Sequence, residues 1–370
     1  MPKIFHTSDI HIGAPFVFLS GKAEQYRSII KDSFTRLVDL CISEKVEVLL
    51  ISGDLFDTNF PSDSNIAFVK EQFQKLSQAG TRVLIIAGNH DYYSEGSVYD
   101  RGIFADLPNI KIFMPPYETL IIPELNCAFY GVSNTTNKSI KHPLGYVKEL
   151  EKDTFHHIAL IHGSMQIVGK DSDSNLPITS EEIQKSGLSY IALGDWHGLN
   201  DFSAGNTKCF YPGSLEPIDF SQVNSGYIIE INFDDKSITA KPRKVGKIKI
   251  ETVEYQFDEN NDLTRLRTVL ADKADPDTVL IVNLAGESIS NLLEIMTELT
   301  SEFESKYFFL KISDKTRVSF DAKDLEKLTN DPIIEAFIQN VEQFAIEKDR
   351  KEFQDQAVQL GLSKLAKITK

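Results

Sequence analysis

The chain has 370 residues, of which 41% are apolar and 25% charged, as is ordinary for a folded globular protein. Its length favours two or more domains, and no window of the sequence is apolar enough to span a membrane. The formal net charge of −15 argues against a chain that holds nucleic acid by a broad basic surface. The three cysteines lie far apart in no metal spacing, and the first residues lack a signal-peptide layout, so we expect a cytoplasmic protein.

The N-terminal part of the chain predicts strands that alternate with helices. Residues 2–8, 46–52 and the apolar run that begins at Val83 are expected to form buried strands. Between them, apolar residues recur at helical spacing, first within 23–44 and again before Gly80. Because a β-α-β-α-β order connects strands that run in the same direction, we expect parallel pairing with right-handed crossovers.

The middle of the chain continues this pattern less regularly. Two apolar runs, 157–161 and 190–193, are expected to form further buried strands, and a strand at 225–233 closes the domain. The less regular segments are a loop-rich stretch, a short strand, an exposed polar loop and a basic linker, at residues 92–120, 129–132, 169–177 and 241–249.

A second, smaller α/β unit is expected after the linker. Its elements are a strand, a helix, a strand, a helix and a strand, at residues 248–257, 262–273, 278–284, 289–305 and 307–313. From Asp321 the chain is a polar helical tail with an apolar stripe at Ile333, Ile334, Phe337, Ile338, Val341 and Phe344. Such a stripe packs either on its own domain or on a partner. We therefore expect three domains, at 1–245, 246–318 and 319–370.

Five apolar runs end in polar residues that suit metal ions. The clearest runs from Val83 to Asp91 and ends in Gly-Asn-His-Asp. In open α/β sheets, ligands bind at the carboxyl ends of the strands. The polar residues found at these ends are Asp9, His11, Asp54, Asn89, His90, His162, Asp195 and His197. Four of the eight histidines in the chain belong to this set, which is hard to explain by structural roles alone.

The chemistry of this set indicates two divalent ions. Carboxylate oxygen together with imidazole nitrogen suits manganese, iron or zinc, whereas magnesium prefers an all-oxygen shell. One central carboxylate can bridge two ions, and ions about 3.5–4 Å apart clamp the attacking and leaving oxygens of a phosphoester displacement. A bound ion also lowers the pKa of water toward neutrality. The set therefore predicts metal-dependent phosphoester hydrolysis.

The five segments together resemble the blocks of calcineurin-like metallophosphoesterases: Asp9-Ile10-His11, Gly53-Asp54-Leu55-Phe56-Asp57, Gly88-Asn89-His90-Asp91, His162-Gly163 and Gly194-Asp195-Trp196-His197. Phe56, the Tyr211-Pro212-Gly213-Ser214-Leu215-Glu216 element and the small α/β unit make the chain similar to SbcD-type DNA repair exonucleases within that superfamily. The resemblance implies a four-layer α/β/β/α sandwich with a small α/β capping domain and a C-terminal helical tail.

The resemblance also assigns roles to individual residues. The first ion would be bound by Asp9, His11 and His197, and Asp54 would bridge to a second ion bound by Asn89 and His162. His90 would stabilise the phosphate transition state or protonate the leaving oxygen, and Asp91 would orient His90 through a hydrogen bond. One position departs from the family, because Asp195 stands where the pattern Gly-His-X-His has its first histidine. We expect Asp195 to bind the second ion in place of that imidazole.

The resemblance further implies a function and partners. It points to DNA end processing, with DNA as substrate, an SbcC-type coiled-coil ATPase as partner and no membrane attachment, and it would allow a homodimer. The two divalent ions are expected to be Mn²⁺, with iron, zinc or magnesium as alternatives. Two other functions stay open. The acidic charge and Asp195 favour a small-molecule phosphodiesterase or phosphatase, and a scaffold subunit with a weak metal site is the third alternative.

Overall fold

The computed structural model describes residues 2–138, 142–147, 149–166, 178–234, 237–257, 263–286, 292–316 and 332–347, together with 357, 358 and 361. The polar loop predicted at 169–177 and most of the predicted tail lie outside these residues. The chain divides into two compact units, Met1–Lys249 and Ile250–Lys370. The expected domain boundary at residue 245 lies close to this division.

The first sheet of the N-terminal unit carries three of the predicted buried strands. It contains β1 (Lys3–Thr7), β2 (Val48–Ser52), β3 (Arg82–Ile86), β4 (Ile110–Ile112), β11 (Tyr227–Phe233) and β12 (Ile238–Lys244), in the order β12-β11-β1-β2-β3-β4. Strands β1 to β4 pair in parallel, and β11 and β12 are antiparallel to their neighbours. The parallel pairing predicted from the β-α-β-α-β order is therefore correct.

The second sheet carries the other two predicted runs. It contains β5 (Glu118–Ile122), β6 (Cys127–Val132), β7 (His156–His162), β8 (Tyr190–Gly194), β9 (Asn200–Asp201) and β10 (Lys208–Tyr211), in the order β5-β6-β7-β8-β10-β9. Strands β6, β7, β8 and β10 are parallel to one another. The carboxyl ends of β7 and β8 therefore lie at one edge of this sheet.

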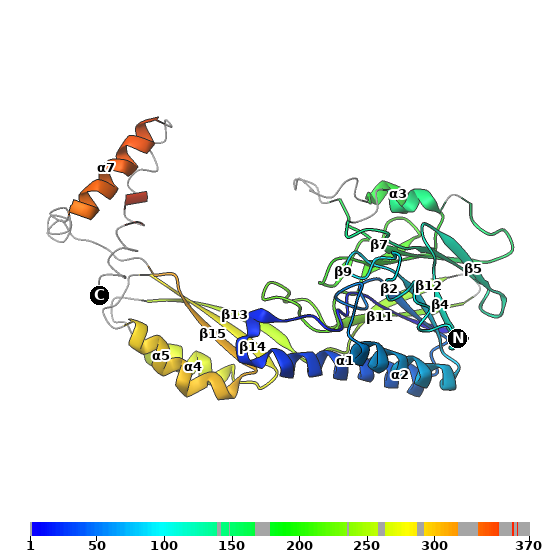
Figure 1. The fold of residues 1–370 in the computed structure, drawn as a ribbon, viewed down its shortest axis with the longest axis horizontal. Coiled ribbons are helices and arrows are strands. Elements are labelled where there is room, and N and C mark those ends of the chain that lie inside the picture. The colour runs from blue at the N-terminus through cyan, green and yellow to red at the C-terminus, as the bar shows by residue number, and fades with distance from the viewer. Residues whose placement is uncertain are drawn as a thin grey trace. The chain divides into compact units, whose positions relative to one another are not determined.

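The two sheets pack face to face, with helices outside both (Figure 1). Their shared core joins apolar side chains such as Leu50 and Leu84 of the first sheet with Phe129 and Leu160 of the second. Helices α1 (Ala23–Ser43) and α2 (Asp63–Ala79) lie on the side of the first sheet, and α3 (Ser180–Lys185) lies on the side of the second. Short 3-10 helices are η1 (Val17–Lys22), η2 (Pro123–Leu125) and η3 (Pro143–Tyr146). This is the expected α/β/β/α order of layers.

Two expectations about irregular segments are wrong. Residues 92–120 are not all loop, because they contain β4 and the start of β5. The basic stretch 241–249 is not simply a linker, because residues up to Lys244 form β12 and pair with β11. Pro242 lies in this strand at the edge of the sheet, where a residue without an N–H group is tolerated.

The second unit has the predicted alternation of strands and helices. Its elements are β13 (Lys249–Gln256), α4 (Leu263–Asp272), β14 (Thr278–Ala285), α5 (Leu292–Phe303), η4 (Glu304–Lys306), β15 (Phe309–Asp314) and α7 (Pro332–Glu347). The sheet order is β13-β14-β15, and α4 and α5 contribute Leu266, Leu270 and Leu299 to a core on one of its faces. Among the residues that the structure describes, no helix has the length and apolar content required to cross a bilayer.

The apolar stripe of the tail lies on α7 and is only partly exposed. Ile334 is buried, whereas Phe344 is 56% exposed. A Cβ atom added to Gly361 would lie 1.9 Å from the Phe337 ring, so that part of the tail packs directly on the stripe. The stripe is thus covered in part by the chain itself.

Candidate metal centre

The carboxyl ends of five strands bring the eight predicted site residues to one place. Asp9 follows β1, Asp54 follows β2, Asn89 follows β3, His162 ends β7 and Asp195 follows β8. The strands leave the sheets through an unusual backbone, because φ is positive at Asp9 (51°), His11 (50°), Asp54 (51°) and Asp195 (109°). Side chains other than glycine rarely adopt these angles, and such strain is concentrated at functional sites.

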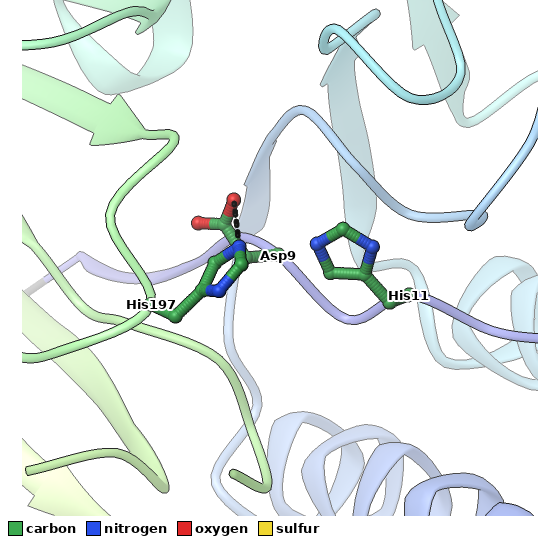
Figure 2. A group of neighbouring side chains, drawn as sticks. All are labelled: Asp9, His11 and His197. Carbon is green, nitrogen blue, oxygen red and sulfur yellow. Dashed lines mark ion pairs between the residues drawn. The ribbon is translucent and has the colours of Figure 1, made fainter. Parts of the chain in front are cut away.

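The first group of candidate ligands is Asp9, His11 and His197 (Figure 2). Asp9 and His11 come from the segment after β1, and His197 comes from the segment after β8. Asp9 and His11 are almost completely buried, and Asp9 Oδ1 lies 3.9 Å from His197 Nε2. The fold thus brings together the three residues that the sequence analysis assigned to the first ion.

The second group contains Asp54, Asn89 and His162. His162 Nε2 lies 2.8 Å from Asn89 Oδ1 and 3.4 Å from Asp54 Oδ2. The same Asp54 oxygen lies 3.6 Å from His11 Nε2, and the other one accepts the backbone N–H of His90. One carboxylate oxygen therefore lies between an imidazole of each group, as a bridging ligand must.

The separations between the ligand atoms suit metal coordination. Two atoms bound to one ion at about 2.1 Å cannot be more than about 4.2 Å apart, and the separations above are all shorter. His11 Nε2 is also buried without a hydrogen-bond partner, and so is aimed at a site that only an ion or water could satisfy. The residues therefore fit a pair of divalent ions.

The hydrogen bonds behind His11 and His162 prepare both rings for metal binding. His11 Nδ1 lies 3.0 Å from Asp57 Oδ1, and His162 Nδ1 lies 2.8 Å from the Ser52 carbonyl oxygen. An N–H at Nδ1 that donates to such an acceptor leaves Nε2 as the metal-binding atom. His197 differs, since the Gln222 amide nitrogen donates to its Nδ1 at 2.6 Å. That amide must present its oxygen instead if His197 is to bind an ion through Nε2.

The site also has unusual proton affinities. Although burial disfavours its charged form, the carboxylates of Asp54, Asp9 and Asp195 hold the pKa of His162 well above its usual range. Burial raises the pKa of Asp9 to about 7 and lowers the pKa of His197 to about 4. A divalent cation would replace the proton of His162, because metal ligands bind in their deprotonated forms.

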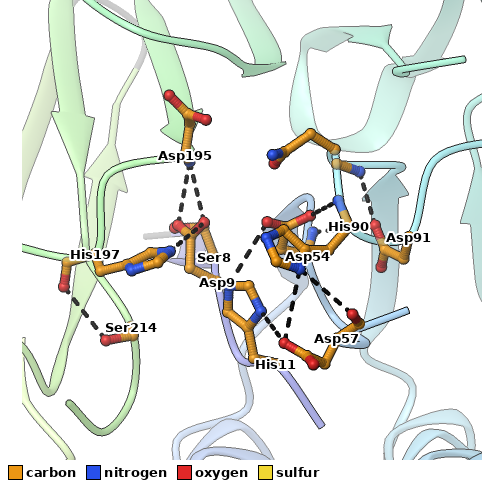
Figure 3. A network of polar contacts seen from close by, with 12 residues as sticks. Ser8, Asp9, His11, Asp54, Asp57, His90, Asp91, Asp195, His197 and Ser214 are labelled. Carbon is orange, nitrogen blue, oxygen red and sulfur yellow. Dashed lines mark hydrogen bonds and ion pairs between the residues drawn. The ribbon is translucent and has the colours of Figure 1, made fainter. Parts of the chain in front are cut away.

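The predicted pairing of His90 with Asp91 is not what the structure shows, and Asp57 takes the place of Asp91 (Figure 3). The Asp91 carboxylate is buried and accepts hydrogen bonds from the Tyr99 hydroxyl and from three backbone N–H groups, those of Asp54, Phe56 and Gly88. It therefore ties the β2 and β3 loops together. His90 is 44% exposed, and its Nδ1 lies 3.3 Å from the Asp57 carbonyl oxygen and 3.7 Å from Asp57 Oδ1.

Asp195 lies beside the second group and is held in a way that the sequence did not reveal. Its Oδ1 lies 3.9 Å from His162 Nε2, and its other carboxylate oxygen accepts a hydrogen bond from the Ser164 hydroxyl. Its backbone N–H donates to both Asp9 oxygens, at 3.1 and 3.3 Å. In Figure 3 its carboxylate points away from Asp9, which places it nearer to the second group than to the first.

Three residues of the site were missed by the sequence analysis: Asp57, Ser164 and Gln222. Asp57 belongs to one of the five sequence blocks and could have been found by its position three residues after Asp54. Ser164 and Gln222 follow no apolar run, and only the folded loops bring them to Asp195 and His197.

The sequence matches the family model of the calcineurin-like phosphoesterases over residues 2–199. The chain belongs to this family. It is 25% identical over 348 residues to the uncharacterized metallophosphoesterase YhaO of Bacillus subtilis, covering 87% of this chain and 83% of that protein. It is 24% identical over 348 residues to the DNA double-strand break repair protein Mre11 of Sulfurisphaera tokodaii, covering 91% and 87%. It is 23% identical over 381 residues to the SbcD component of the nuclease SbcCD of Staphylococcus epidermidis, covering 92% and 93%.

The family membership confirms several expectations. The α/β metallophosphoesterase fold is confirmed, and so is a metal-dependent phosphodiesterase of the hydrolase class. The family and the clustered ligand atoms together imply divalent metal ions.

Proposed function

We propose that this chain is a DNA nuclease of the SbcD type that hydrolyses phosphodiesters at DNA ends with two divalent ions, most naturally Mn²⁺. The observation that carries the proposal is the arrangement of Asp54 Oδ2 between His11 Nε2 and His162 Nε2, at 3.6 and 3.4 Å. Similarity to two proteins named as a nuclease and as a DNA repair protein extends along about nine-tenths of the chain, beyond the phosphoesterase unit.

The residues would divide the work as follows. Asp9, His11 and His197 would hold one ion, Asn89, His162 and Asp195 the other, and Asp54 both. The ions would lower the pKa of the attacking water and neutralise charge on the phosphate. His90 is the one exposed imidazole at the centre, so it can reach a substrate and donate a proton to the leaving oxygen. Asp57 would hold His90 and His11 in place, and Asp91 would fix the loops that carry them.

The proposal includes a partner. The SbcD-type assignment implies an SbcC-type coiled-coil ATPase, and the exposed end of the α7 stripe is a candidate contact for it. A small-molecule phosphodiesterase is the second candidate function, because a net charge of −15 does not favour a DNA substrate.

A direct comparison of substrates tests the proposal. The purified chain, stripped of metal and then given Mn²⁺, is assayed on linear double-stranded DNA, single-stranded DNA and a bis-aryl phosphate, with His90→Asn as the matched inactive control. We expect hydrolysis of DNA and of the diester by the wild-type chain, and neither by the variant. Hydrolysis of the small diester without any DNA product, with or without a coiled-coil ATPase, would identify a small-molecule enzyme instead.

A further inference from the structure

The contact between Ser164 and Asp195 involves the position at which the metal centre departs from the family pattern. We propose that Ser164 is a positioning residue that fixes Asp195, so that a carboxylate oxygen replaces an imidazole at the second ion and makes this site selective for hard, oxygen-preferring metals. The inference rests on the proposed two-ion function.

The geometry around Asp195 leaves its carboxylate one orientation. The Ser164 hydroxyl donates a hydrogen bond to Oδ2, and Oδ1 lies 3.9 Å from His162 Nε2. The backbone N–H of Asp195 donates to both oxygens of Asp9. The residue is thus held at its backbone by a ligand of the first ion and at its side chain by Ser164.

The backbone brings the shorter side chain close enough to act as a ligand. Asp195 has φ of 109°, a strained value for a residue with a Cβ atom. The preceding Gly194 approaches the Ser52 carbonyl so closely that an added Cβ would lie 2.0 Å from the oxygen. A carboxylate is shorter than an imidazole, and this close approach of β8 to β2 compensates for the difference in length.

Ser164 itself is fixed by its neighbours. The Tyr211 hydroxyl donates to the carbonyl oxygen of Gly163 at 2.5 Å, and the Tyr211 ring stacks on Trp196 with centroids 5.1 Å apart. Tyr211 is completely buried. The two residues that flank the Ser164–Asp195 contact in the chain are therefore joined through one buried ring.

The consequence is an oxygen-rich second site. Three oxygens surround His162 Nε2, from Asn89 at 2.8 Å, Asp54 at 3.4 Å and Asp195 at 3.9 Å. One nitrogen with three oxygens, two of them from carboxylates, favours manganese or magnesium over zinc. A histidine at position 195 would shift the balance toward nitrogen and toward zinc.

Metal binding to the metal-free full-length chain tests the role of Ser164. Calorimetric titration with Mn²⁺ and electron paramagnetic resonance of the product are compared for wild type, Ser164→Ala, Ser164→Thr and the exposed control Ser180→Ala. We expect two Mn²⁺ ions per wild-type chain with the signal of a coupled pair. Ser164→Ala should weaken the second binding step at least tenfold and leave the first unchanged, and Ser164→Thr, which keeps the hydroxyl, should restore it. Two unchanged binding steps in Ser164→Ala would overturn the proposal.

A double substitution separates positioning from general damage to the loop. Asp195→His should bind zinc in preference to manganese at the second site, and adding Ser164→Ala to it should change nothing, since the carboxylate that Ser164 holds is gone. Equal weakening by Ser164→Ala in both backgrounds would make Ser164 a merely structural residue and refute the proposal.

Two further outcomes are distinguishable. Should Ser164→Ala fail to fold, as judged by its melting curve, Asp195→Asn tests the same site: loss of the second Mn²⁺ supports the proposal and retention of two tightly bound ions refutes it. Normal metal binding by the wild-type chain with no hydrolysis of DNA would refute the proposed nuclease function and leave the role of Ser164 standing.

Discussion

At the scale of single residues, the metal centre concentrates strained backbone and buried charge. Four site residues, Asp9, His11, Asp54 and Asp195, have positive φ, each at a cost of about 1–3 kcal/mol. Gly88 passes so close to Asp54 that an added Cβ would lie 2.1 Å from its Oδ1, so glycine is required there. The fold therefore sacrifices stability to bring these ligands together, and substitutions at the centre separate into those that remove an ion and those that remove a proton donor.

His90→Asn is expected to keep both ions and to lower turnover by two or more orders of magnitude, which is typical for loss of a general acid or a charge-stabilising group. Asp54→Asn should instead release the ion pair, because Asp54 Oδ2 lies close to ligands of both groups. Metal content by mass spectrometry and turnover of a bis-aryl phosphate distinguish the two variants. Near-normal turnover of His90→Asn would show that His90 is not the catalytic group.

His6 gives a prediction about stability that does not involve the metal centre. Burial lowers the pKa of His6 to about 3, whereas the unfolded chain takes up a proton at this residue below about pH 6.5. The free energy of unfolding should therefore fall as the pH decreases from 6.5 toward 3, with a loss of about 2 kcal/mol at pH 5 from this residue alone.

Melting temperatures at pH 7 and pH 5 measure this effect. In His6→Gln, which cannot be protonated in this range, the drop in melting temperature between the two pH values should be smaller than in the wild-type chain. An equal drop in both proteins would show that His6 does not contribute to the acid sensitivity.

At the scale of elements, the sequence predicted those strands that are long, apolar and buried. β2, β3, β7 and β8 are runs of aliphatic residues that end in glycine or a polar residue, and their ends carry the candidate ligands. This is why a ligand set could be predicted without a structure. The short edge strand β4 and the polar edge strand β12 could not, because their side chains are only partly buried and Pro242 interrupts the pattern.

Contacts between loops were beyond the sequence. Asp91 has the same position in the chain whether it bonds to His90 or to the loops after β2 and β3, and only the folded turn decides between them. The left-handed backbone at Asp54 turns the chain so that Asp57, and not Asp91, faces His90. Side chains on loops gain their partners from such turns, which local sequence patterns do not encode.

The helix α7 carries a prediction about partners. Its exposed residue Phe344 lies toward the end of the stripe that is distant from the buried Ile334. If α7 binds a coiled-coil ATPase, Phe344→Asp should reduce co-purification of the two proteins and leave hydrolysis of a small diester unchanged. Ile334→Asp should instead lower the melting temperature of the tail, because it places a charge in a buried position. Full co-purification by Phe344→Asp would place the contact elsewhere.

At the scale of the whole molecule, the negative charge and the metal centre act against each other. The chain has a net charge of −15 and the candidate ligands include three carboxylates, Asp9, Asp54 and Asp195. Two divalent ions would reverse the sign of the charge at the site while the surface stays acidic. Attraction of a phosphodiester would then be confined to the metal centre.

Activity should accordingly depend on added metal. Treatment with EDTA followed by dialysis is expected to abolish hydrolysis of any phosphodiester, and Mn²⁺ should restore it better than Mg²⁺, since the ligand set mixes imidazole with carboxylate. The measurement is the initial rate after each addition. Full activity of the exhaustively chelated protein would contradict the dimetal assignment.

Binding of DNA should be governed by the same ions. His90→Asn, which is expected to bind metal but not to cleave, can be titrated with a fluorescent DNA end in Mn²⁺ and in EDTA. Since each phosphate contact made by a basic side chain adds about −0.9 to the slope of log K against log salt, a local metal-mediated contact predicts a slope shallower than about −3 and no measurable binding in EDTA. A steep slope, or binding that survives EDTA, would reveal a basic surface on the isolated chain that its overall charge conceals.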